Sequence, residues 1–581
     1  MRIKHFFGLA VLAAMTASCS SNNELVNGGN GSGENESGAS YASFSINLPT
    51  RSGTRAASDP TFDPGSDYEY KVNDATLLIF KKGEPTKEGE TPKEGDYTFV
   101  ESAELGSMAP WQKPNPDETG VTTHAKITAK LKHVDKNGNF FALVLLNNGT
   151  GTNTKVVVPT TEGMKFSEWN AAAKAKDIAN YTNGFYMANA PLFNNNNVTT
   201  LVAIDKDKIY PTEEQAAKSA ATDIYVERGL AKVTLKTGKA ATGKTDDNYT
   251  VTGVTYKGDM VTIKNWALDV TNTKTFPIHN VDGLSDDYTD IWSNTGTPAG
   301  SNGATTQRFV DNKDTKAKRV YWGKDPNYDN KDADKTALNV EFNYVKNADV
   351  TVEPSKPLYC LENTFNLANM MQGQTTRVVF KAKYTPKNFT DGETFYKIGK
   401  NTDIWKEDDL KQEIEAAVAS VVSGAAGKIT VDLKAKGNDI TAAGTHYIKA
   451  ANITVNGVEA ETIEKAITAI NTQLGLKESD KVGISTYAGG ESYYIARIKH
   501  FGDDLTSWKS GSYGKNNLEY LGRYGVLRNN WYELTVNSVS NPGYPSVPDV
   551  KPNTPDDEDD KYISVSVKIL DWAKRSQNVD L

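Results

Sequence analysis

Two short segments, one near each end of the chain, alternate apolar and polar side chains without a break. In the first, the apolar positions are Ala42, Phe44, Ile46 and Leu48. In the second, they are Ile563, Val565, Val567 and Ile569. An apolar residue at every second position predicts a β-strand that buries one face. Since the two segments share this pattern, each is suited to fill the same kind of groove in a sheet.

The chain between these segments consists mainly of further strand patterns. Residues 76–80 and 140–146 are nearly continuous apolar runs, which are typical of strands buried on both faces. Residues 125–131 alternate and predict a strand with one solvated face. Residues 224–235 predict one long strand that opens a second domain. With 46 Gly, 27 Tyr and abundant Thr, Asn and Val, the chain is predicted to be all-β with minor helices.

Three segments carry helical patterns instead. Residues 167–178 begin with a serine, which is a good helix-capping residue. Residues 407–422 and 462–474 each place apolar side chains on one helical stripe, and Gly424 follows the first of them, where a helix stop is expected. We expect these helices to cover the edges of sheets or to lie in inserted loops.

A proline-rich and acidic segment precedes the last predicted strand. Residues 541–561 contain five prolines and an unbroken acidic run over 556–560. Prolines stiffen a chain and like charges repel each other, so the segment predicts a semi-rigid spacer outside the core. We expect it to hold the last strand away from the body. Residues 280–340, rich in Asn, Asp, Gly and Lys, predict surface loops.

The first 18 residues predict a signal for export. Arg2 and Lys4 precede an apolar run over residues 6–15 that is too short to span a bilayer comfortably. Small residues then lead into Cys19, the order of a lipoprotein signal peptide whose cysteine carries diacylglycerol. An ordinary signal peptide with a cysteine nearby is the alternative, but the polar residues 20–23 favour a lipidated Cys19 on a tether.

Charge and length limit the classes of function. The 581 residues suggest roughly two to four domains. The net charge of −8 and the pI of about 5.5 argue against nucleic acid as a partner. No second apolar run approaches transmembrane length, so we expect membrane contact only through the lipid on the precursor.

The sequence offers little catalytic or metal-binding chemistry. The six histidines are scattered, and no common zinc, redox or nucleotide-binding motif is present. Cys360, the one cysteine besides Cys19, is expected to be a small buried apolar residue. The acidic loop 325–334 lacks the glycine and terminal glutamate of an EF-hand, so a solvated loop is favoured over a calcium site. We predict no enzyme, no cofactor and no metal.

A group of aromatic residues in the last third of the chain allows a carbohydrate platform. Packing within strands is the commoner role of such residues, and we favour it here. The residues are Tyr487, Tyr493, Tyr494, Trp508 and Tyr513.

A basic stretch, residues 51–56, follows the first strand and is a suitable substrate for a trypsin-like protease. A chain that loses its own strand and offers a similar strand elsewhere is able to polymerise by strand exchange. The sequence therefore raises the hypothesis of a self-assembling subunit.

Several short motifs are spread in order over the whole chain. They are the lipobox at Cys19, residues 53–56, 226–233, 266–272, 321–328, 362–364, 525–532 and 567–572, and the chain end 579–581. Together these motifs resemble those of the Bacteroidales fimbrillins, and most closely the shaft subunit of Porphyromonas-type short (minor) fimbriae.

The resemblance implies two tandem transthyretin-like β-sandwich domains over residues 56–223 and 224–545, followed by a spacer and C-terminal donor strand over 546–581. It implies export to the outer membrane as a lipoprotein. An Arg-specific protease would then remove a propeptide, residues 19–55, with its plug strand. The bond cut would be Arg55–Ala56, with Arg51–Ser52 as the alternative.

The implied function is that of a pilus shaft subunit that supports adhesion. Its partners would be identical subunits, accessory anchor and tip subunits, the protease, and ligands on host or bacterial surfaces. One alternative is an accessory or tip adhesin of the same system. Another is a surface glycan-binding lipoprotein that never polymerises and folds its C-terminal strand into its own sheet.

Overall fold

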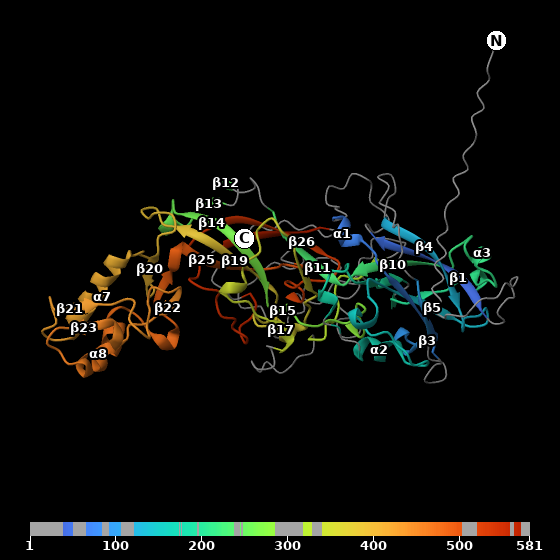
Figure 1. Cartoon of the computed structure of the whole chain (residues 1–581), viewed down its shortest axis with the longest axis horizontal. Coiled ribbons are helices and arrows are strands. Elements are labelled where there is room, and N and C mark those ends of the chain that lie inside the picture. Colours follow the sequence, from blue (N-terminus) through green and yellow to red (C-terminus); the bar gives the residue numbers. More distant parts are fainter. Residues whose placement is uncertain are drawn as a thin grey trace, which may run out of the picture.

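The computed structural model describes most of the chain from residue 39 to residue 570. Figure 1 shows an elongated molecule with a first β-domain at one end, a second β-domain in the middle and an inserted module at the other end. Of Leu48 and of the strand 563–570, the backbone alone is described. The described residues are 39–49, 66–83, 92–105, 121–172, 175, 177–194, 197–236, 244–245, 248–284, 318–327, 340–501, 520–557 and 563–570.

The first domain is built on one curled sheet. Its strands follow the order β3, β2, β5, β6, β10, β1, β4, and β9 pairs with β5. Their bounds are Ser40–Pro49 (β1), Ala75–Lys81 (β2), Thr98–Glu104 (β3), Val121–Leu131 (β4), Phe140–Leu146 (β5), Met187–Asn189 (β6), Val202–Ala203 (β9) and Thr222–Arg228 (β10). The two ends of the sheet meet, because the Glu101 carboxylate on β3 accepts hydrogen bonds from the backbone N–H groups of Lys132 and His133, just after β4.

Strands β2 and β5 lie in the core of this domain, as their apolar runs predict. Leu77, Leu78 and Phe80 of β2 are fully buried. Helix α2 (Phe166–Ala172) packs on Phe80 through Phe166, with ring centroids 5.5 Å apart. The helix ends six residues before the predicted residue 178. Two further short helices are α1 (Asp67–Tyr70) and α3 (Glu213–Ala216).

The predicted long strand 224–235 is in fact two strands that divide at Gly229. Strand β10 pairs with β1 and β6 of the first sheet, whereas β11 (Leu230–Leu235) pairs with strands of the second domain. A Cβ on Gly229 would lie 2.9 Å from Ile178 and 3.0 Å from Tyr186, so the close approach of the first domain requires glycine here. The change of sheet therefore comes five residues later than the predicted domain boundary.

The second domain is a sandwich of two sheets. One sheet has the order β18, β11, β26, β27, and the other has the order β12, β13, β14, β19, β25. Their bounds are Leu358–Leu361 (β18), Trp531–Val539 (β26), Ile563–Leu570 (β27), Lys244–Thr245 (β12), Asn248–Thr250 (β13), Met260–Asp269 (β14), Arg377–Thr385 (β19) and Glu491–Arg497 (β25). Tyr532 and Leu534 on β26 share one buried core with Phe380 on β19 and Tyr494 on β25 of the facing sheet.

Short strands of two or three residues form further hydrogen-bonded pairs outside these sheets. Strands β15 (Thr271–Asn272) and β17 (Phe342–Asn343) form one pair. Strand β7 (Leu192–Asn194) pairs with β8 (Asn197–Thr199) and, across the two domains, with β16 (Lys318–Arg319).

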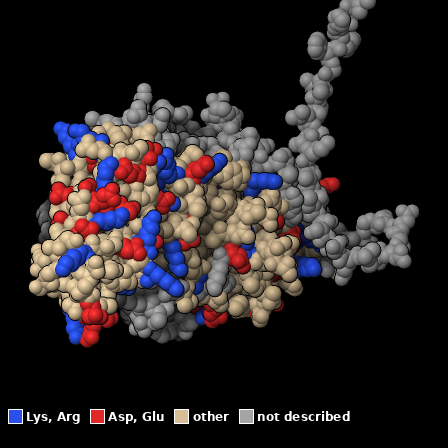
Figure 2. Space-filling view, turned by 60° about the vertical axis from the view of Figure 1, so that its left-hand side comes forward, with Lys and Arg blue, Asp and Glu red and all other residues tan. Residues whose placement is uncertain are grey.

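An inserted module follows β20 (Phe395–Ile398) and returns at β24 (Ile484–Tyr487). It has its own apolar core, which includes the buried Leu410, Ile414 and Ile470. Figure 2 shows acidic and basic side chains interspersed over the described residues of the face that this end presents. The module confirms both predicted helices and their place in an insertion. Its elements are α7 (Glu407–Val421), α8 (Ala460–Gln473), β21 (Ile429–Val431), β22 (Gly444–His446) and β23 (Ile453–Val455).

Residues 541–557, which we call the strap, pack along the second domain. Tyr544 exchanges two backbone hydrogen bonds of 2.8 Å with Tyr493. Asp556 and Asp557 are buried and bonded to side chains of the body. The prediction of an exposed spacer is therefore wrong for the strap, because its acidic groups find partners that are remote in sequence.

The described residues form a mostly β protein with few helices, which confirms the predicted fold class. Within those residues, the structure holds no helix of the length and apolar character needed to cross a bilayer.

Candidate assembly site

Strand β1 lies inside the first sheet and not at its edge. It pairs antiparallel with β4 along its whole length, from Ser40 opposite Leu131 to Pro49 opposite Val121. On its other side it runs parallel to β10, with Phe44 opposite Thr222. Without β1, the backbone groups of β4 and β10 along this slot would lose their partners, so the slot is suited to accept an extended strand.

The side chains of β1 are part of the domain core. Ala42, Phe44 and Ile46 are fully buried, as the alternation in the sequence predicts. Ser43, on the opposite face, is also buried, and its hydroxyl lies 2.6 Å from the hydroxyl of Thr128 on β4. Strand β1 therefore contributes one apolar face and a full set of backbone bonds to the domain.

The C-terminal strand β27 lies at the edge of its own sheet. It pairs antiparallel with β26 from Ile563 opposite Val539 to Leu570 opposite Trp531, with an irregularity between Val536 and Ser538. In the described part of that sheet, β26 is its one neighbour. The two strands with matching patterns thus occupy different domains of one chain, one between two neighbours and one beside a single neighbour.

A buried ionic junction joins the two domains. The Glu69 carboxylate, which follows the proposed cleavage segment, lies 2.7 Å from the Lys232 ammonium on β11. Tyr359 donates a hydrogen bond of 2.5 Å to the same carboxylate, and the Arg228 guanidinium donates to the Glu69 carbonyl at 2.9 Å. Glu69 is fully buried, so this group fixes α1 to the second domain.

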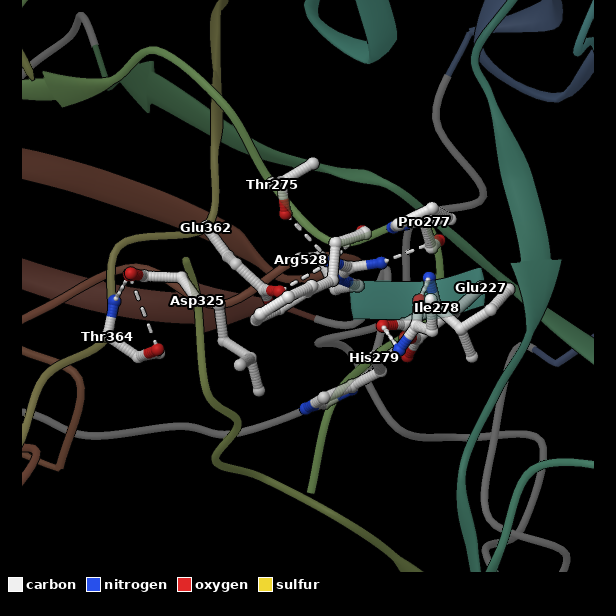
Figure 3. A network of polar contacts seen from close by, with 12 residues as sticks. Glu227, Thr275, Pro277, Ile278, His279, Asp325, Glu362, Thr364 and Arg528 are labelled. Atoms are coloured by element: carbon white, nitrogen blue, oxygen red, sulfur yellow. Dashed lines mark hydrogen bonds and ion pairs between the residues drawn. The ribbon is translucent and has the colours of Figure 1, made fainter. Parts of the chain in front are cut away.

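Figure 3 shows a second buried network, which is centred on Arg528. Arg528 pairs with Glu362 and donates hydrogen bonds of 2.9 Å to the Thr275 hydroxyl and the Phe276 carbonyl. Burial alone would raise the pKa of Glu362, but the Arg528 guanidinium beside it holds that pKa below its ordinary value.

The imidazole of His279 belongs to this network as well. Its Nδ1 lies 3.1 Å from the Glu227 carboxylate, and its Nε2 lies 3.0 Å from the Trp322 carbonyl. Burial alone would lower the pKa of His279, but the Glu227 carboxylate raises it overall. The contact between His279 and Glu227, which lies on β10 of the first domain, links this network to both domains.

Asp325 lies at the rim of this network and differs from its prediction. It is buried and accepts hydrogen bonds of 2.7 Å from the backbone N–H groups of Thr364 and Asn327, so it is not solvated. Burial raises its pKa to about 7. Among the described residues, no group of His, Cys, Asp or Glu side chains is arranged to hold a metal ion.

Of the other residues named in the sequence analysis, some lie in the described part of the structure and some do not. Tyr487, Tyr493 and Tyr494 are buried; Tyr487 and Tyr494 belong to the core of the sandwich, whereas Tyr493 packs against the strap. Cys360 is buried as predicted, and burial raises the pKa of its thiol to about 12. The remaining candidates lie outside the described residues: Cys19, Arg51, Ser52, Arg55, Ala56, Trp508 and Tyr513.

Sequence reasoning missed the roles of Glu69, Arg528 and Asp557. Their ion-pair partners lie 163, 166 and 34 positions away, respectively, so no local pattern reveals them. The motifs around 226–233 and 525–532 mark the junction, but they carry no sign of which residue each side chain meets.

Comparison with known proteins bears on the segment that contains β25, β26, the strap and β27. Residues 485–578 match the family described as "Major fimbrial subunit protein type IV, Fimbrillin, C-terminal". The chain ends in a fimbrillin segment. This match confirms the resemblance to fimbrillins over that segment. A search of curated proteins finds no match.

Solved structures align with this chain over most of its length, at low identity and low TM-score. A "putative cell adhesion protein" from Parabacteroides distasonis aligns with 10% identity and a TM-score of 0.36, covering 93% of this chain and 99% of its own. The tip fimbrial protein Mfa3 from Porphyromonas gingivalis aligns with 12% identity and a TM-score of 0.22, covering 92% and 100%.

Proposed function

We propose that this fimbrillin is the structural shaft subunit of a cell-surface fimbria, polymerised by exchange of strands between copies. The observation that carries the proposal is the position of β1. It occupies the slot between β4 and β10 with Ala42, Phe44 and Ile46 fully buried, and the sequence directly after it contains Arg51 and Arg55. Cleavage there would leave β1 as a separate, exchangeable peptide.

The energetics favour β1 while it is tethered. Burial of Phe44 and Ile46 contributes about 1.5–3 kcal/mol each, and each backbone hydrogen bond adds about 1 kcal/mol. Ordering the strand opposes this by about 1–2 kcal/mol per residue. With these sums close to balance, the high effective concentration of a tethered strand decides in its favour. Cutting the chain removes that advantage, so a neighbour's strand is then able to compete.

The sequence of β27 fits the slot of β1 better in one register than in the two registers that are shifted by two residues. In step with β1, Ile563 takes the place of Ala42 and Val565 that of Phe44. A shift of two residues would bring Lys561 or Asp571 to an apolar position at one end of the face. Because burying an unpaired charge is costly, the in-step register is preferred. It also requires β27 to run as β1 does, antiparallel to β4.

The rest of the proposal follows the order of processing. The precursor is exported as a lipoprotein on Cys19, reaches the outer membrane, and is cut at Arg55–Ala56, or at Arg51–Ser52, by an Arg-specific protease. The mature subunit then joins identical subunits and accessory anchor and tip subunits. Adhesion to surface ligands is a property of the assembled fimbria.

The pairing of β27 with β26 supports a second candidate, a surface lipoprotein that keeps its C-terminal strand and never polymerises. Intact mass and size after limited trypsin treatment separate the two. The shaft proposal expects cleavage at Arg55 followed by SDS-resistant ladders, and the loss of those ladders when residues 562–581 are deleted. A cleaved protein that stays monomeric would favour the second candidate or a tip adhesin.

A further inference from the structure

The strap is fastened to the second domain at several points along its length. The Gly543 carbonyl accepts a hydrogen bond of 2.8 Å from the Tyr487 hydroxyl. Asn347 accepts one of 2.7 Å from the Val547 N–H, and Arg377 donates one of 2.7 Å to the Pro548 carbonyl. Backbone and side-chain groups of the body therefore hold the strap before its acidic end is reached.

The last two described residues of the strap carry the strongest fastening. The Asp557 carboxylate pairs with the Arg523 guanidinium and accepts a hydrogen bond of 2.5 Å from the Tyr524 hydroxyl. Asp556 accepts one of 2.8 Å from the Thr375 hydroxyl. We call these contacts the clasp. Since its charged groups are buried, pulling the strap away would leave Arg523 without its paired carboxylate.

Strand β27, which follows the clasp, is held by backbone pairing with a single strand. Within the described sheet, β27 has a neighbour along one edge only, which is β26. Separating such an edge strand breaks one ladder of backbone bonds, whose groups water is able to satisfy afterwards. Release of the strap would additionally break the buried ion pair of the clasp.

We propose that the clasp is the fixed root of the exchangeable arm, so that on assembly the chain leaves the body only after Asp557 while the strap stays in place. The inference rests on the proposed function, in which β27 is the donor. The 13 residues 558–570, from the clasp to the end of β27, span about 43 Å when extended, at roughly 3.3 Å per residue. The clasp thus sets both the origin and the reach of the arm.

Two engineered disulfides test this in the full chain with Cys19→Ser. The first, Met371→Cys with Pro555→Cys, ties the strap to the body, because these two residues form an antiparallel bridge. The second, Thr535→Cys with Ser566→Cys, ties β27 to β26 at facing positions. Facing residues of antiparallel strands lie within the Cα separation that a disulfide requires. Cys360 is buried and stays out of the exchange.

Each variant is oxidised, its disulfide is verified by intact mass, and the protein is cut with trypsin and analysed for SDS-resistant ladders. We expect ladders from the 371–555 variant and none from the 535–566 variant until dithiothreitol is added. If both disulfides block the ladders, the clasp is not the root, while the proposed function stands. If neither blocks them, β27 is not the donor, and the proposed function fails together with the inference.

Single substitutions test the clasp residue itself. Asp557→Asn should raise hydrogen exchange of the amides in 549–557 at least about tenfold in the precursor, since the buried Arg523 loses its paired charge. Asp549→Asn is the matched control, because Asp549 lies on the same strap but forms an exposed ion pair with Lys481. Equal exchange in the wild type and both variants would overturn the assigned role of Asp557.

Discussion

Replacing Phe44 by alanine gives a direct measure of whether β1 is a temporary part of the fold. Phe44 lies in the middle of β1, between β4 and β10, and is fully buried. Losing its transfer free energy costs about 1.5–3 kcal/mol, and the cavity left between two fixed strands raises the total to about 3–5 kcal/mol. We therefore expect Phe44→Ala to destabilise the first domain of the precursor by this amount.

The readout is hydrogen exchange of the β5 amides, followed by mass spectrometry. Strand β5 is central in the same core, so its amides exchange only when the first domain unfolds. A loss of about 3–5 kcal/mol raises their exchange rate by roughly 10²- to 10⁴-fold. On the proposed function, trypsin cleavage and assembly remove β1, so the Phe44→Ala and wild-type polymers should exchange alike.

Leu77→Ala is the matched control. Leu77 is fully buried in the same core but lies on β2, which the mature subunit keeps. It should cost about 2–5 kcal/mol in precursor and polymer alike. If the Phe44→Ala polymer exchanges as fast as its precursor does, β1 remains in the slot and strand exchange is refuted. A change below about tenfold in the precursor would refute the energetic reasoning.

Three further predictions concern other parts of the chain. Glu69→Ala removes the buried carboxylate that pairs with the Lys232 ammonium and should cost about 3–5 kcal/mol in urea unfolding, whereas Glu461→Ala, at an exposed pair, should cost under about 1 kcal/mol. Burial raises the pKa of Asp325 to about 7, so the folded state binds its proton more tightly than the unfolded state. Its contribution to stability, on the order of 4 kcal/mol at most, is present below about pH 4 and lost as the pH rises to 7, and Asp325→Asn should remove that slope from urea unfolding. Replacing residues 400–482 by an Asn-Gly turn should leave the trypsin-induced ladders intact, because Ile398 and Ile484 face each other in β20 and β24 and the module has its own core. Loss of the ladders would show that the module takes part in assembly.

The features that the sequence predicts well are those set by local periodicity. The alternation correctly predicts that the apolar side chains Ala42, Phe44 and Ile46 of β1 are buried, although Ser43 on the other face is buried as well, and the apolar runs of β2 and β5 predict central strands. Helices α7 and α8 begin and end within two residues of their predicted bounds. In each case the side-chain pattern alone decides which face meets the core.

Features that depend on remote partners escape such reasoning. The run at 556–560 has the composition of a solvated spacer, yet Asp557 meets Arg523, and Asp556 meets Thr375, 181 positions away. The local sequence pattern also does not predict that residues 224–235 divide into two strands at Gly229. The close approach of Ile178 and Tyr186, which excludes a side chain at Gly229, comes from residues remote in sequence.

The division at Gly229 also has a mechanical consequence. The slot of β1 is bordered by β10, which continues through one residue into β11; β11 pairs with β26, and β26 with β27. A force that pulls along a strand in the slot is therefore passed from β10 through the backbone to β11, and then through hydrogen-bonded pairing to β26 and β27. Along this path the force acts parallel to the strands, so it loads the backbone hydrogen bonds in shear. Since β1 and β10 run parallel, such a load acts on all their bonds together instead of opening them one by one. A filament of these subunits would transmit tension along a nearly continuous line of β-structure, and the buried ion pairs at the junction would resist bending of that line.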